Sequence, residues 1–147
     1  MERKALRPAL TDEGARGRSR PWLVGATILT VCAGLGSRKF GAHLPGFVAE
    51  YAGDALYATL IYVLAAFVRP RSKGLHLASF AFVFSALVEA SQAVHVGALD
   101  AVRATLPGRL VLGTTFVWSD FPCYAAGALL GLSVDTVAGK LAHSRRA

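Results

Sequence analysis

Residues 75–96 read LHLASFAFVFSALVEASQAVHV, an apolar run in which Glu89 is the one acidic residue. A bilayer core needs about 20 helical residues per span, so this run is long enough to cross it. Three further apolar runs begin at Pro21, Asp54 and Phe116. The first two reach only about 15 or 16 residues, which makes them marginal spans alone but credible ones within a bundle. The sequence therefore predicts a membrane protein built from four helices.

The composition of the 147-residue chain also argues against a soluble fold. Apolar residues make up 54%, there are 15 glycines, and charged residues reach only 17%. Soluble domains have roughly 45–50% apolar residues with glycine included and about 25% charged residues. Residues 1–20 hold nine of the 25 charges, so the rest of the chain has too few to coat a soluble surface. The same figures exclude collagen-like, disulfide-rich and intrinsically disordered classes.

We therefore expect an all-α polytopic membrane bundle of four transmembrane helices, because no barrel-type alternation persists anywhere. A short extracytoplasmic interfacial helix is expected at Leu44–Tyr51, ahead of the second span. A signal peptide is the alternative for the first run, but no clean small-x-small cleavage pattern follows it. The predicted parts are a disordered basic tail (1–20), a transmembrane domain (21–139; spans at about 21–37, 53–69, 75–97 and 116–138) and a C-terminal tail (140–147).

The distribution of basic residues predicts the orientation in the membrane. Twelve Lys and Arg residues lie in the two tails and the 69–74 break, against four in the other two loops. By the positive-inside rule both termini are cytoplasmic, in a bacterial inner membrane. The net charge of +7 sits at the ends of apolar segments. This placement favours contact with anionic lipid headgroups and disfavours a nucleic-acid partner.

With this orientation, the unusual polar residues gather near the outer ends of the spans, and the inner halves have no comparable set. Glu89 and Gln92 stand three residues apart and share a helix face. An ionised side chain in the membrane costs about 2.5–3.5 kcal/mol, so Glu89 should face the bundle or a wet cavity, with Arg103 as its nearest basic partner. The candidate ligand-binding residues are Glu89, Gln92, Arg103, Arg109, Asp120, Asp54, Ser119 and Arg38.

Two interpretations of these residues stay open. Buried polar side chains mark ligand or catalytic sites in membranes, but they also join short helices through hydrogen bonds. Asp54 and Asp120 stand near helix starts, where an acid complements the helix dipole. His95 extends an E-x-x-Q-x-x-H series, yet zinc needs three or four ligands that converge from several segments. No metal or other cofactor is expected, and no catalytic residue can be assigned.

Several motifs resemble a small uncharacterised bacterial membrane family of the DUF type, which sometimes carries an automated ribosomal-maturation label. The resemblance runs from about Arg20 to Ala138 and implies a membrane protein without assigning any chemistry. The motifs are Ser37-Arg38-x-Phe40-Gly41, Leu44-Pro45, Tyr51-x-Gly53-Asp54-x-Leu56, Glu89-x-Ser91-Gln92, Arg103-Ala104-Thr105, Trp118-Ser119-Asp120 and Tyr124-x-x-Gly127-x-Leu129-Leu130-Gly131.

The second half also resembles the VanZ-like domain, a membrane family associated with glycopeptide (teicoplanin) resistance. Its pattern is a glutamate and a glutamine three apart, an arginine, and an aspartate ahead of a glycine-rich helix. The matching positions are Glu89, Gln92, Arg103 or Arg109, Asp120, Gly127 and Gly131. Pro107-Gly108-Arg109 is similar to its proline-glycine-arginine element, which leaves the choice of arginine open. The chain departs from the pattern at Tyr124, where VanZ-like chains commonly have asparagine.

Three functions follow as hypotheses. The first is an envelope protein that binds a lipid-linked, cell-wall-like or glycopeptide ligand, with Arg103 or Arg109 on an anionic headgroup and Glu89, Gln92 and Asp120 accepting hydrogen bonds. The second is a membrane enzyme with Glu89 and Asp120 as an acid–base pair on a lipid substrate, although no nucleophile signature accompanies them. The third is a small transporter or channel subunit. The lipid bilayer is the expected partner, and the sequence indicates no oligomeric state.

Overall fold

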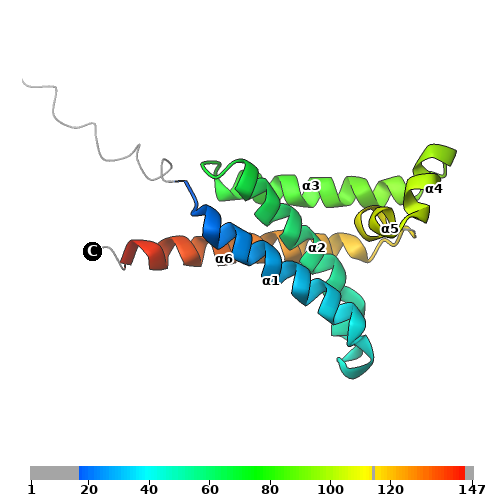
Figure 1. Ribbon diagram of the computed structural model, residues 1–147, viewed down its shortest axis with the longest axis horizontal. Helices are drawn as coiled ribbons and strands as arrows, with labels where there is room; N and C mark the ends of the chain where they lie inside the picture. The colour runs from blue at the N-terminus through cyan, green and yellow to red at the C-terminus, as the bar shows by residue number, and fades with distance from the viewer. Residues whose placement is uncertain (1–16, 114, 145–147) are drawn as a thin grey trace, which may run out of the picture.

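The computed structural model describes residues 17–113 and 115–144, and the described residues are helical without a strand (Figure 1). This confirms the predicted all-α class. Of the predicted tails, residues 1–16 and 145–147 lie outside the described residues. The helices are α1 (Arg20–Lys39), the 3-10 helix η1 (Gly41–His43), α2 (Gly46–Val68), α3 (Gly74–Gln92), α4 (Gly97–Ala104), α5 (Leu106–Leu112) and α6 (Asp120–Ser144).

Three of these helices are long and apolar enough to cross a membrane: α2, α3 and the Asp120–Ala142 part of α6. Only 28%, 28% and 22% of their most apolar windows are buried inside the protein. Large apolar side chains of these helices, such as Val68, Leu87 and Leu129, are exposed instead. A helix whose apolar surface stays mostly uncovered is suited to lipid, where no polar coat is needed. The chain is thus a membrane-type helical protein, while a fourth span at α1 stays a prediction.

The boundaries of the elements differ from the predicted ones at several places: the third span, predicted at 75–97, ends at Gln92, and the fourth, predicted from 116, begins at Asp120. Residues 46–51 are the first turns of α2 and do not form a separate interfacial helix, since α2 runs unbroken from Gly46 to Val68 with Pro45 as its N-cap. Residues 97–112, expected to be a loop, form the short helices α4 and α5. Pro107 stands in the first turn of α5, and the Thr105 hydroxyl caps it by accepting from the Gly108 N–H at 3.1 Å.

The long helices form two antiparallel pairs that cross obliquely (Figure 1). In Figure 1, α1 lies beside α2, and α3 lies beside α6. The two pairs meet closely where α1 and α3 begin and α2 and α6 end, and they diverge toward the other end. One branch of the divergent end carries η1 and the start of α2, and the other carries α4 and α5. We call the divergent end the open end and the opposite one the packed end.

Small residues make the crossing between α2 and α6 close. A Cβ on Gly127 would lie 1.9 Å from the Ala55 carbonyl oxygen, and one on Gly131 would lie 2.7 Å from the Tyr62 ring. The Thr59 hydroxyl donates to the Gly127 carbonyl oxygen at 2.8 Å. The glycine pair of α6 therefore packs against α2 within the chain, the arrangement that small residues favour between membrane helices. The apolar core lies on the packed side of this crossing: Leu23, Tyr62, Val63, Ala66, Leu77, Ala78, Ala81 and Ala128.

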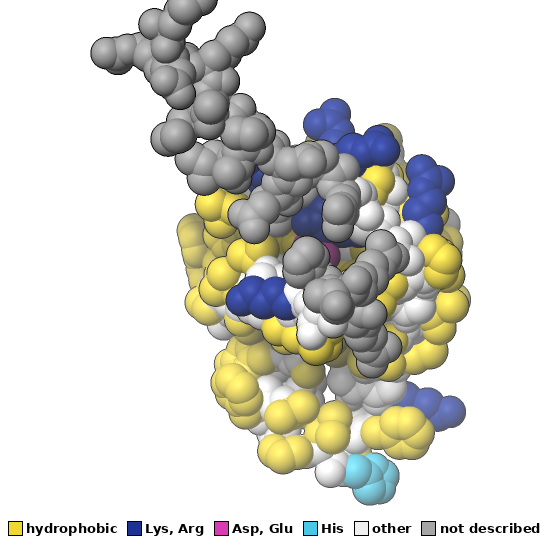
Figure 2. All heavy atoms as spheres, turned by 90° about the vertical axis from the view of Figure 1, so that its left-hand side faces the viewer, with side chains coloured by type: hydrophobic (Ala, Val, Ile, Leu, Met, Phe, Trp, Pro, Cys, Tyr) yellow, Lys and Arg dark blue, Asp and Glu magenta, His cyan; other side chains and the backbone are white. Residues whose placement is uncertain are grey.

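Lys and Arg side chains gather around the packed end, with apolar side chains on its flanks (Figure 2). Arg69, Arg71 and Lys73 stand on the turn between α2 and α3, and Arg20 stands at the start of α1. The positions of these residues agree with the side that the positive-inside rule makes cytoplasmic. The orientation itself stays a prediction.

Candidate functional site

Glu89 is enclosed between α3, α6 and the segment before α6, with 1% of its surface exposed. Its Oε1 accepts a hydrogen bond from the Val117 backbone N–H at 2.6 Å. Its Oε2 accepts from the Tyr124 hydroxyl at 2.7 Å and from the Gln92 amide at 3.0 Å. Both carboxylate oxygens are thus satisfied by the protein's own donors. The three-residue spacing of Glu89 and Gln92 correctly predicted that they share one face of α3.

A glycine closes this cluster from the side of the α5–α6 connection. Gly113 has a φ of 65°, a left-handed conformation that side chains rarely adopt. A Cβ there would also lie 2.5 Å from the Gln92 side-chain nitrogen. The backbone therefore passes directly over Gln92, which is 7% exposed. Glu89, Gln92 and Tyr124 form a sealed polar cluster, and we call it the Glu89 cluster.

Arg103, at the end of α4, lies against the C-terminus of α3 and makes no bond to Glu89. Its Nη2 donates to the Ser91 carbonyl oxygen at 2.6 Å, and its Nη1 donates to the Val94 carbonyl oxygen at 3.0 Å. The last carbonyls of a helix lack partners within the helix and carry partial negative charge, so a guanidinium group is a suitable cap. The Asp100 carboxylate lies 3.3 Å from Nη1. The Arg103 Nε is buried and has no described hydrogen-bond partner.

Arg109 extends from α5 toward the same place. Arg103, Arg109, His95 and Asp100 line a shallow pocket of about 360 Å³. The His95 Nδ1 lies 3.6 Å from the Asp100 carboxylate. Two guanidinium groups thus face one carboxylate, which leaves the pocket with a net positive charge. We call it the Arg103–Arg109 pocket.

Asp54, Asp120 and Arg38 form a third polar group, on the α2 side of the open end. The Asp54 carboxylate is half-buried and lies within electrostatic range of Asp120, Arg38 and Glu89. A Cβ on Gly53 would lie 3.5 Å from the Arg38 Nε, so the Arg38 side chain lies over the backbone at Gly53. The Ser119 hydroxyl donates to the Asp120 carboxylate at 3.4 Å. Asp120 is the first residue of α6, where an acid complements the helix dipole.

An apolar groove of about 690 Å³ runs beside this third group, between the start of α2 and the start of α6. Phe47, Tyr51 and Ala55 line it from α2, and Pro122 and Cys123 line it from α6. Ser119 is its one polar hydroxyl besides Tyr51. Both walls belong to helices that are long and apolar enough to cross a membrane.

The eight candidate residues are therefore brought to one end of the protein but not to one site. Glu89 and Gln92 belong to the Glu89 cluster. Arg103 and Arg109 belong to the Arg103–Arg109 pocket. The other four candidates lie on the α2 side of the open end: Asp54, Asp120, Ser119 and Arg38. Tyr124 was part of a family motif and a departure from the VanZ-like pattern, but it was not among the candidate site residues. The structure makes it the side-chain partner nearest to Glu89. An acid inside an apolar helix signals that such a donor must exist, but not which residue supplies it.

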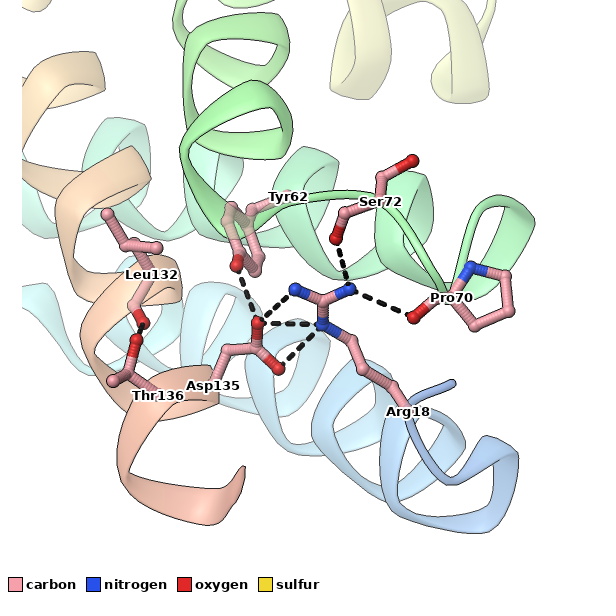
Figure 3. A network of polar contacts seen from close by, with 7 residues as sticks. All are labelled: Arg18, Tyr62, Pro70, Ser72, Leu132, Asp135 and Thr136. Atoms are coloured by element: carbon pink, nitrogen blue, oxygen red, sulfur yellow. Dashed lines mark hydrogen bonds and ion pairs between the residues drawn. The ribbon is translucent and has the colours of Figure 1, made fainter. Parts of the chain in front are cut away.

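A second polar network, at the packed end, was missed in the sequence (Figure 3). The Arg18 Nε donates to the Asp135 carboxylate oxygens at 2.8 and 2.7 Å, and its Nη1 donates to the carbonyl oxygens of Pro70 and Ser72. The Tyr62 hydroxyl donates to Asp135 at 2.7 Å. Burial lowers the pKa of Arg18, but its contact with Asp135 outweighs that effect and raises it. The expectation that the inner halves of the spans hold no polar set comparable to the outer one overlooked this network.

The comparison with known proteins is consistent with this description. A family model described as "Protein of unknown function (DUF2809)" matches residues 43–128, which is more than half of the chain. The matched range includes α2, α3, α4 and α5 and the first turns of α6. It therefore contains the Glu89 cluster and the Arg103–Arg109 pocket. No solved structure matches the chain.

Proposed function

The chain belongs to the DUF2809 family of proteins of unknown function, and we propose that it is a multi-pass membrane protein that binds a phosphate-bearing lipid of the cell envelope. The observation that carries this proposal is the convergence of Arg103 and Arg109, from two separate helices, on one pocket. Guanidinium groups bind phosphate through charge-assisted hydrogen bonds in a planar, bidentate geometry.

The pocket is prepared for an anion before any ligand arrives. Arg103 is 6% exposed and is held by the carbonyl oxygens of Ser91 and Val94. Because its Nε is buried, Arg103 contributes its positive charge to the pocket, and the accessible donors belong to Arg109. Arg109 is exposed and free to move toward a headgroup. An anchored arginine next to a mobile one lowers the ordering cost of binding, since only one side chain has to be fixed.

The surroundings of the pocket suit an amphipathic ligand. Val102, Leu106, Leu110 and Val111 on α4 and α5 are exposed apolar side chains. In the proposed topology these short helices lie at the extracytoplasmic membrane surface, with α1, α2, α3 and α6 as four spans. A headgroup in the pocket would leave the attached hydrocarbon chain beside apolar protein and lipid. This supports a lipid-linked envelope molecule, in line with the VanZ-like pattern of Glu89, Gln92 and an arginine.

In this proposal Glu89 and Gln92 have a structural role and do not contact the ligand. Their polar atoms are satisfied internally, and the cluster joins α3 to α6 and to the segment that leads away from the pocket. A substrate could not reach the Glu89 carboxylate in this conformation, because 1% of the residue is exposed. The geometry thus disfavours the acid–base enzyme hypothesis that uses Glu89 with Asp120.

A pair of ligands with the same tail tests the proposal. Purified protein in nanodiscs is titrated with a fluorescent polyprenyl phosphate and with the corresponding polyprenol. The phosphate is expected to bind at least about tenfold more tightly, since one charge-assisted hydrogen bond contributes roughly 1.5–3 kcal/mol. Arg109→Gln should remove most of that difference, and Lys39→Gln, an exposed cation at the same end, should not. Equal affinity for the two ligands would refute the proposal.

A further inference from the structure

A second groove lies at the packed end of the protein, on the face of the α2–α3 hairpin. It has a volume of about 520 Å³, within the range of small-molecule sites. Its α2 wall is formed by residues at i, i+3, i+4 and i+7, which make one continuous helix face. These residues are Ile61, Leu64, Ala65 and Val68, and the opposite wall is formed by Leu77, Phe80 and Phe84 of α3.

The groove is polar only where it reaches the turn between the two helices. Arg69, Ser72 and His76 line that end. Within the part of the chain that the structure describes, the side chains of Arg69 and His76 form no ion pair or hydrogen bond. The turn also carries Arg71 and Lys73, and residues 69–76 contain no acid. The groove thus combines an apolar trough with a cationic end.

The cationic end is held in a fixed position by the network of Figure 3. Arg18 donates through its backbone N–H and its Nη1 to the Pro70 carbonyl oxygen, and through Nη1 also to that of Ser72. Figure 3 shows its guanidinium group between these carbonyls and Asp135. The one acidic residue described near this turn is therefore already paired with Arg18. The charges of Arg69, Arg71 and Lys73 stay unneutralised on a rigid turn.

We infer that this groove binds an anionic glycerophospholipid of the adjacent leaflet, with the phosphate at Arg69 and His76 and an acyl chain along Leu64, Phe80 and Phe84. Two features select this occupant. The trough is walled by two membrane-type helices, so its apolar part lies at the depth of lipid chains. Basic side chains at the end of such helices attract anionic headgroups of the nearby surface. This site is distinct from the Arg103–Arg109 pocket and lies at the opposite end of the protein.

Native mass spectrometry of the purified full chain tests this inference. The protein is equilibrated with phosphatidylglycerol or with phosphatidylcholine of identical acyl chains, and the bound lipids are counted. Phosphatidylglycerol should be retained preferentially. Arg69→Gln should weaken its binding about fivefold, and the double change with His76→Gln should weaken it further. Lys140→Gln removes an exposed cation from α6 at the same end, outside the groove, and should leave binding unchanged.

A fluorescence measurement tests the apolar part of the site separately. Phe80 is 52% exposed, so Phe80→Trp adds a reporter in the trough without disturbing the core. Brominated phosphatidylglycerol should quench this added emission more strongly than brominated phosphatidylcholine does, and Arg69→Gln should remove the difference.

Four results would overturn the inference: equal retention of the two lipids, an equal loss with Lys140→Gln, no loss with Arg69→Gln and His76→Gln, or a dimer that excludes lipid from the groove. Arg109→Gln separates this inference from the proposed function. If that change, and not Arg69→Gln, abolishes phosphatidylglycerol retention, the lipid occupies the Arg103–Arg109 pocket and the groove inference fails. If Arg69→Gln lowers phospholipid retention while polyprenyl phosphate binding persists, the two sites are independent.

Discussion

Replacing Glu89 by glutamine probes the sealed cluster with almost no change in shape. The three groups that face the carboxylate are all donors: the Val117 N–H, the Tyr124 hydroxyl and the Gln92 amide. A glutamine offers one acceptor oxygen and an NH₂ group in place of two acceptor oxygens. If its oxygen accepts from Val117, its NH₂ group faces Tyr124 and Gln92, and at least one buried donor loses its acceptor.

The expected cost follows from these contacts. A hydrogen bond to a charged group contributes roughly 1.5–3 kcal/mol, and an unsatisfied buried donor costs about 1–3 kcal/mol. The loss is partly offset because glutamine avoids burying a charge. We therefore expect Glu89→Gln to lower the free energy of unfolding by about 2–4 kcal/mol. Tyr124→Phe, which removes one donor and leaves the other two, should cost about 1–3 kcal/mol.

The free energy of unfolding is measured by titrating the purified protein with SDS in mixed micelles and following circular dichroism. Asp120→Asn is the matched control, since this carboxylate accepts one long bond from Ser119 and should change stability by less than about 1 kcal/mol. A Glu89→Gln protein as stable as the wild type would refute the structural role. If that stable variant also lost ligand binding, the carboxylate would belong to the functional site.

Three further predictions concern packing, the second polar network and topology. Gly127→Val should lower the free energy of unfolding by at least about 3 kcal/mol and separate α2 from α6, because its Cβ would overlap the Ala55 carbonyl oxygen. Gly139→Val is the control and should be tolerated, since nothing lies within 4 Å of a Cβ there. Equal melting temperatures of the two variants would contradict the close crossing. Arg18→Ala and Asp135→Ala should each lower the free energy of unfolding by about 2–3 kcal/mol. This is less than for a fully buried ion pair, because the two side chains are 16% and 11% exposed. A double-mutant cycle should show a coupling energy above about 1 kcal/mol, and additive losses would argue against the ion pair. A C-terminal alkaline phosphatase fusion should be inactive and a C-terminal green fluorescent protein fusion bright, and the reverse pattern would overturn the cytoplasmic placement of the C-terminus.

Local sequence patterns predicted those helices and helix faces that depend only on residues close together in the chain. Apolar run length identified α2, α3 and α6, and the three-residue spacing predicted the shared face of Glu89 and Gln92. The interfacial helix at Leu44–Tyr51 was predicted as a separate element because the apolar run was taken to begin at Asp54. In the structure the helix continues through Gly53, since tertiary packing against α1 and α6 supports it.

The contacts made over long distances in the chain could not be predicted in this way. Arg18 and Asp135 are separated by 117 positions, and their pairing depends on how α1 and α6 are placed. Arg103 was expected near Glu89 because both lie toward the outer side. Its actual partners are the end carbonyls of α3, and this choice depends on how residues 93–105 fold back over that helix. For such residues the sequence predicts a side of the membrane, but it does not identify the neighbouring side chain.

The position of α6 has a consequence for the way the protein is made. This helix is made after the other described helices, yet it supplies Tyr124 to Glu89, Gly127 to the crossing with α2, and Asp135 to Arg18. Until it arrives, Glu89 lacks its Tyr124 donor and Arg18 lacks the Asp135 carboxylate, although Gln92 and the Pro70 and Ser72 carbonyls are already present. A chain cut short before residue 120 therefore keeps two incompletely paired charges and should be recognised by membrane quality control as unfinished. Completion of α6 is the step that supplies the missing partners of the earlier helices.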